Sequence, residues 1–285
     1  ISGTQDTAGP MARTVADAAM LLNAIAGGDS ADPATAEADA RKADFTAGLI
    51  TASLEGVRVG VLSGQIGNRA DVRALFEAAV ADMERAGATV VRIDYDWPDG
   101  FWQRSLAVLL FELRRDMDAY LGSLPGSGLP RSLADVVAFN RANAEAELRW
   151  FAQALFEQAL AATDEAAYRE ALETNLAATR RDGIDRLLAE HEVDVLVAPT
   201  AGPAWVTDLV NGDSFSGSIG AGSLAAIAGY PHLTVPMGAV ERLPVGISFM
   251  GGKWQDHAVL KIGAAYERAR SAALPQPSLQ RWQPE

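Results

Sequence analysis

The 285-residue sequence contains no cysteine and only three histidines. The absence of cysteine excludes disulfides, thiolate nucleophiles and zinc–thiolate sites. The histidines lie far apart, at positions 191, 232 and 257, and the sequence contains neither an HExxH motif nor a close histidine pair. We therefore expect no metal site. A Ser-His-Asp triad is not expected either, although His232, at the start of a predicted strand, could point inward.

Basic residues are also scarce, with 24 lysines and arginines against 37 acidic residues and a net charge of −13. This balance argues against binding of nucleic acid. The uncharged stretch 214–240 contains five glycines and two prolines among serines and threonines, so it predicts a buried helix and strand and no membrane span. No cofactor is predicted. The compartment stays open, with the cytoplasm as the default, because a targeting segment could precede Ile1.

The order of apolar patterns predicts an α/β fold. A capped helix begins after Thr14 and ends at a Gly-Gly pair, and residues 57–94 read as strand, helix and strand, a βαβ unit with parallel strands. Residues 193–200 are apolar on both faces, which is typical of a strand inside a sheet. We predict a mixed sheet covered by helices on both faces. Further helices are expected at 101–121, 132–160, 165–190, 218–228 and 256–270, and strands at 232–238 and 244–251.

Two glycine-rich stretches leave a nucleotide-binding alternative open. SGQIGN (63–68) lies between a strand and a helix, and GAGSLA (220–225) is similar to a GxGxxA turn at the start of a helix. The first lacks the residues of a P-loop, and the second follows a polar loop where a dinucleotide site requires a strand. Both signals are weak.

Four distinctive segments follow one another along the chain. They are SGTQDTAGPMARTVADAA (2–19), SLADVVAFNRANAEAELRWFAQALFEQA (132–159), VLVAPT (195–200), and AGYPHLTVPMG (228–238) with LPVGISFMG (243–251). Together these segments resemble the amidase signature family and, within it, the bacterial peptide amidases. Two departures from the family pattern are Thr4, where the family has Ser, and Ala152, where the subgroup has Gly.

The resemblance implies amide hydrolysis by a Ser, a cis-Ser and a Lys, with backbone N–H groups forming the oxyanion hole. In the family all three residues precede the segment that begins here at Gly3, so this chain is expected to carry no catalytic residue. Its three lysines, Lys42, Lys253 and Lys261, lie in regions that the family does not use for catalysis. By the same resemblance, Gln5 and Asp6 are expected to support the catalytic loop from below.

Substrate contacts are expected where ligands gather in such sheets, at the carboxyl ends of the strands. The candidates are Trp205 in the loop after residue 200, Ser218 and Ile219 near the next helix, and Phe151 and Gln153 in the helical segment. For Phe151, packing in the core is the alternative.

The main hypothesis is therefore that residues 1–285 form the C-terminal portion of one amidase domain, with the βαβ unit and a helical subregion within 57–190. Its substrate would be a small carboxamide or an amidated peptide, and its partner the N-terminal catalytic half. The alternative is a non-catalytic module, either truncated or paired with a separately encoded half. An uncovered sheet edge or apolar patch is expected where that half would pack.

Overall fold

A computed structural model of the chain describes residues 1–214 and 219–275. In this part of the chain the strands form a five-stranded sheet with the order β2-β1-β3-β5-β4. The bounds of the strands are Arg58–Leu62 (β1), Thr89–Ile93 (β2), Val195–Pro199 (β3), His232–Val240 (β4) and Leu243–Met250 (β5).

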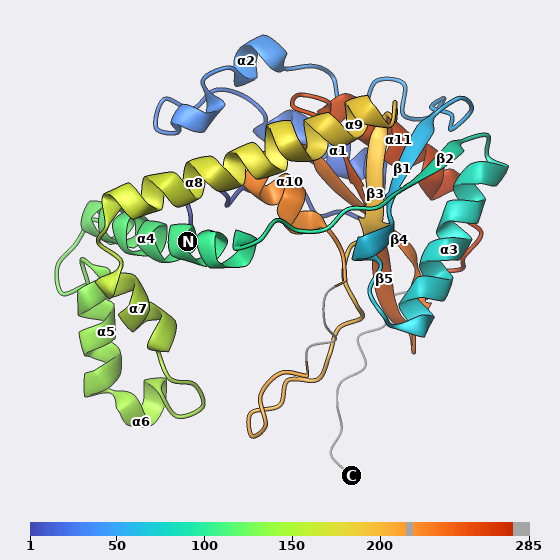
Figure 1. The fold of residues 1–285 in the computed structure, drawn as a ribbon. Helices are drawn as coiled ribbons and strands as arrows, with labels where there is room; N and C mark the ends of the chain where they lie inside the picture. Colours follow the sequence, from blue (N-terminus) through green and yellow to red (C-terminus); the bar gives the residue numbers. More distant parts are fainter. Residues whose placement is uncertain (215–218, 276–285) are drawn as a thin grey trace.

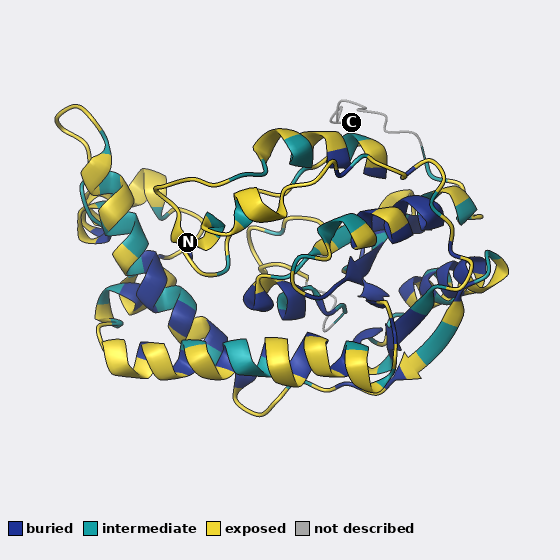
Figure 2. Cartoon of the chain, turned by 90° about the horizontal axis from the view of Figure 1, so that it is seen from above, coloured by how far each residue is buried: buried dark blue, intermediate teal, exposed yellow. Residues whose placement is uncertain are grey.

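The sheet is mixed, as predicted. β1 pairs in parallel with β2 and β3, and β5 pairs antiparallel with β3 and β4. Every residue of β3 is buried, which confirms that this strand lies inside the sheet. Figure 2 shows the buried residues concentrated in the strands and on the helix faces turned toward them.

Helices cover both faces of the sheet (Figure 1). On one face, α1 (Val15–Ile25), α3 (Ala70–Arg85) and α11 (Asp256–Ala269) bury a cluster that includes Val61, Val197 and Phe249. On the other face, α9 (Asp185–Glu190) and α10 (Gly222–Ala228) bury a second cluster around Leu62, Leu196 and Met250. Alternate strand residues thus enter opposite cores, and the fold is the predicted α/β fold with a sheet covered on both faces.

The part of the chain that connects β2 to β3 forms a helical region that projects from the sheet. Figure 1 shows α4 and α8 side by side, with α5, α6 and α7 below the left part of α4. The bounds of these helices are Phe101–Ser123 (α4), Leu133–Ala142 (α5), Ala144–Glu147 (α6), Ala154–Ala161 (α7) and Glu165–Thr179 (α8). A distorted turn at Arg180–Ile184 (η3) joins α8 to α9.

Residues 27–57 form an irregular connection with one 3₁₀ turn, Pro33–Thr35 (η1), and one short helix, Ala38–Arg41 (α2); a second 3₁₀ turn, Ser63–Gln65 (η2), follows β1. None of the described helices is both long and apolar enough to cross a membrane.

Candidate functional site

The motif segment, residues 2–6, folds as a tight turn. The Asp6 amide donates to the Ser2 carbonyl at 3.0 Å, and the Gln5 amide donates to Ser2 Oγ at 3.2 Å. The Ser2 amide in turn donates to Asp6 Oδ2 at 2.9 Å. The short polar side chains of Ser2 and Asp6 therefore supply partners that the backbone of this segment lacks, as they do in Asx and Ser/Thr turns.

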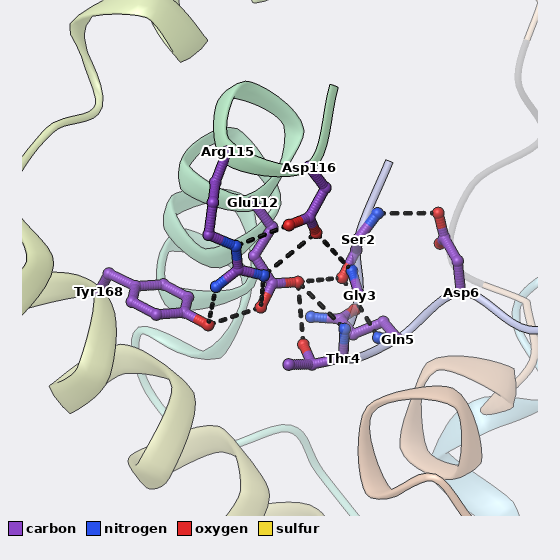
Figure 3. Close-up of polar contacts among 9 residues, drawn as sticks. All are labelled: Ser2, Gly3, Thr4, Gln5, Asp6, Glu112, Arg115, Asp116 and Tyr168. Carbon is purple, nitrogen blue, oxygen red and sulfur yellow. Dashed lines mark hydrogen bonds and ion pairs between the residues drawn. The ribbon is translucent and has the colours of Figure 1, made fainter. Parts of the chain in front are cut away.

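A buried carboxylate holds this turn against the helical region (Figure 3). Glu112, on α4, is fully buried. Its Oε2 accepts hydrogen bonds from the Ser2 hydroxyl, from Thr4 Oγ1 at 3.0 Å and from the Thr4 amide at 3.3 Å. Its Oε1 accepts the Tyr168 hydroxyl of α8 at 2.6 Å and lies 3.5 Å from the Arg115 guanidinium. One carboxylate thus joins the motif segment to two helices.

Asp116, one turn further along α4, adds a second attachment. It accepts the Gly3 amide at 2.8 Å and pairs with Arg115 at 2.6 Å. The Asp116 carboxylate raises the pKa of the Arg115 guanidinium, so this arginine stays charged beside both acidic groups. Burial, and then the bond to Glu112, raise the pKa of the Tyr168 hydroxyl, which therefore remains a donor near neutral pH.

Gln5 follows these anchored residues and lines a cavity of about 270 Å³ between α4 and α10. The walls are mostly apolar and are formed by Trp102, Leu106 and Leu109 of α4 and by Ala226 and Ile227 of α10. Ser105 and Ser223 add hydroxyl groups. Among the predicted functional residues that the structure describes, only Gln5 lines this cavity.

The carboxyl end of β3 carries a separate polar cluster. Thr200 Oγ1 and Ser248 Oγ lie 2.9 Å apart, and His232 Nε2 lies 2.7 Å from the same Ser248 oxygen. Ser248 is fully buried, whereas His232, the first residue of β4, keeps part of its surface open to solvent. The crowding of its ring by protein atoms nevertheless lowers the pKa of the imidazole. Because the Ser248 hydroxyl is closed off from solvent, this Ser–His pair is not placed to attack a substrate.

The predicted substrate residues lie on two further elements. Phe151, between α6 and α7, is 61% exposed, so the alternative of core packing is wrong. Gln153 is buried: its Oε1 accepts Asn140 Nδ2 at 3.0 Å and its Nε2 donates to the Val137 carbonyl at 3.3 Å. These bonds tie the start of α7 to α5.

The loop after β3 carries the remaining candidates. Trp205 is 45% exposed, and Ile219 packs partly buried against the core on the α11 face of the sheet. Ser218 lies outside the described residues. Gln5 and Asp6, the α5–α7 pair and this loop are therefore three separate places in the molecule.

Other catalytic groups are not assembled in the described residues. All three lysines are exposed, and Lys253 pairs with Glu37 at 3.4 Å. His191 ends α9, and His257 at the start of α11 contacts the Ala47 carbonyl. Within residues 1–214 and 219–275, no three His, Asp or Glu side chains are grouped so as to hold a metal ion.

Glu112 was not singled out by the sequence patterns, although a signal was present. The spacing 4, 3, 4 places it on the same helix face as Phe101, Ser105 and Val108, all of which are buried. An acidic residue on the apolar face of an amphipathic helix indicates a buried ionic or hydrogen-bonded partner. The sequence does not reveal that the partner comes from residues 2–4.

The fold and the motif segment have counterparts among known proteins. The family model described as Amidase matches residues 1–260. The native peptide amidase of Stenotrophomonas maltophilia has a similar structure, with a TM-score of 0.84 and 41% identity, covering 96% of this chain and 55% of that one. The peptide amidase PAM bound to the competitive inhibitor chymostatin gives a TM-score of 0.88 with 42% identity, over 95% of this chain and 55% of that one.

Curated relatives are more distant. A probable amidase of Arabidopsis thaliana is 31% identical, and the match covers 94% of this chain and 49% of the relative. One component of the glutamyl-tRNA(Gln) amidotransferase of Acinetobacter baumannii is 29% identical over 92% of this chain and 54% of its own length. The chain thus spans about half the length of these relatives. Since the family model covers nearly all of the described residues, the chain belongs to the amidase family.

Proposed function

We propose that this chain is part of an amidase that hydrolyses carboxamide C–N bonds, with the C-terminal amides of peptides as its substrate class. The observation that supports this most is the 41–42% identity to the two peptide amidase structures over almost the whole chain. The anchored motif segment is consistent with it.

In this proposal the Ser, cis-Ser and Lys come from a segment that precedes the motif segment in the family. The nucleophilic Ser would attack the amide carbon while the Lys and cis-Ser carry its proton to the leaving amine, and backbone N–H groups would stabilise the oxyanion. The present chain would contribute support and substrate contacts. Gln5 and Asp6 would lie under the catalytic loop, and the contacts would come from Phe151, Gln153, Trp205, Ser218 and Ile219.

The first prediction concerns this chain by itself. An amidase needs its nucleophile, base and oxyanion donors together, and the loss of a nucleophile and its base costs on the order of 10⁶-fold in kcat. We expect the 285-residue chain to release no ammonia from an N-blocked dipeptide amide above background and to react with no serine-directed fluorophosphonate probe. Specific labelling of one serine with turnover would show that the catalytic residues lie within this chain.

Reconstitution tests whether this chain forms an active amidase when a catalytic half is supplied. The upstream half of the Stenotrophomonas peptide amidase, co-expressed as a separate polypeptide, should associate with this chain and yield both probe labelling on the upstream half and ammonia release. The upstream half alone is the control. Association without turnover on any amide tested would favour the alternative, a non-catalytic module.

A further inference from the structure

The fold removes the Glu112 carboxyl group completely from water. Burial of a carboxylate costs several kcal/mol unless donors replace its hydration. Five donors converge on it: the Ser2 hydroxyl, the Thr4 amide and hydroxyl, the Tyr168 hydroxyl and the Arg115 guanidinium. Three of the five come from the motif segment.

Two carboxylates of α4, Glu112 and Asp116, bind three consecutive residues of the motif segment. Glu112 binds Ser2 and Thr4, and Asp116 binds the Gly3 amide between them. A Cβ on Gly3 would lie 3.0 Å from Asp116 Oδ2, so glycine permits the close approach. A slip by one residue would place Gly3, which has no side chain, opposite Glu112 and leave the carboxylate short of donors. The arrangement therefore defines one register.

We propose that Glu112 is a positioning residue that fixes the register of Ser2–Thr4 and thereby places Gln5 at the wall of the cavity between α4 and α10. A carboxylate suits this task because it only accepts hydrogen bonds, so it selects a segment that presents donors. The inference rests on the proposed function in one respect only, namely that the motif segment supports the catalytic loop.

Hydrogen–deuterium exchange of the full chain tests the register directly. Thr4→Val removes one donor from an exposed residue and keeps its shape, so the variant should fold. We expect the amides of residues 3–6 to exchange at least about fivefold faster, while peptides from β1 and β3 exchange as in the wild type. Thr4→Ser retains the hydroxyl and should restore slow exchange. Thr7→Val, the same change on an exposed threonine beyond the anchored turn, is the matched control.

Equal exchange of residues 3–6 in Thr4→Val and Thr7→Val would overturn the proposal. Glu112→Gln gives a second test by hydrogen–deuterium exchange. The NH₂ group of the glutamine would face one of the donors that now bind Glu112, so a hydrogen bond would be lost. Faster exchange restricted to residues 1–12 supports the positioning role, and faster exchange throughout the sheet contradicts it.

The reconstituted amidase separates this proposal from the proposed function. There Thr4→Val should lower kcat several-fold with KM unchanged, and Thr4→Ser should recover it. If the wild-type pair shows no turnover while exchange behaves as expected, the proposed function fails and the positioning role stands. If turnover occurs and Thr4→Val leaves kcat unchanged, the link between this register and catalysis is overturned.

Discussion

His232 is exposed as a residue, yet its imidazole makes a partly buried hydrogen bond to Ser248, and burial lowers the pKa of the imidazole below the ordinary value of 6.5. Above pH 6.5 the imidazole is neutral in both the folded and the unfolded chain. As the pH falls below 6.5, the unfolded chain binds the proton first, so the free energy of unfolding decreases until the folded pKa is passed.

We therefore predict that the wild-type chain loses more stability between pH 7 and pH 5 than His232→Gln does. The difference should not exceed about 1 kcal/mol, because the ring retains solvent exposure. Urea unfolding at both pH values measures it, and His191→Gln, at the C-terminal end of α9, serves as the control. A larger loss in the His232 variant than in the wild type would contradict the assignment.

The sequence patterns identify local contacts but not the distant partners of a side chain. Gln5 and Asp6 stand out in the sequence, yet five donors converge on Glu112, which lies more than 100 positions away. The residues around a carboxylate in a helix do not show which distant part of the chain it binds. The Thr14 cap of α1, by contrast, was predictable because its bond to the Asp17 amide is local.

The sequence predicted where the helices lie along the chain but not where they are interrupted. The span 132–160 reads as one helix, whereas the structure ends α5 at Ala142, where Asn143 Nδ2 donates back to the Phe139 carbonyl. The span 165–190 is interrupted at Gly183, where a Cβ would lie 2.6 Å from the Ala178 carbonyl oxygen. The helix expected from Ser218 starts at Gly222.

The hydrogen bonds between α5 and α7 give a further prediction. Asn140→Ala and Gln153→Ala each remove the hydrogen bond between these side chains, and each should lower the free energy of unfolding by about 1–2 kcal/mol. Urea unfolding followed by tryptophan fluorescence reports the change. Gln158→Ala, on the exposed side of α7, should stay within about 0.5 kcal/mol of the wild type. Equal changes in the free energy of unfolding of all three variants would mean that the Asn140–Gln153 hydrogen bond does not stabilise the chain.

The sheet was predictable because buried strands carry strong apolar runs and the βαβ pattern sets their direction. An exposed apolar patch was also expected from the sequence, but its position beside the cavity between α4 and α10 was not predictable. Trp102 and Leu106 of α4 are 51% and 43% exposed beside it, although large apolar side chains usually pack inside.

These exposed side chains predict self-association. Leu106→Gln should lower the apparent association of the chain in sedimentation velocity by at least about twofold, because it removes apolar area beside the cavity. Leu129→Gln changes a residue of similar exposure, 47%, in the loop between α4 and α5 and should leave association unchanged. Equal effects of the two substitutions would mean that association does not involve this surface.

The attachment of Ser2 and Thr4 to Glu112 also sets an order of events in folding. The bonds close loops of 110 and 108 residues, and Tyr168 completes the site from 56 residues further on. Closing so long a loop has a large entropic cost that is not recovered until α4 and α8 have packed. During synthesis residues 2–6 leave the ribosome before α4 and α8, yet we expect them to take their final structure after those helices have packed.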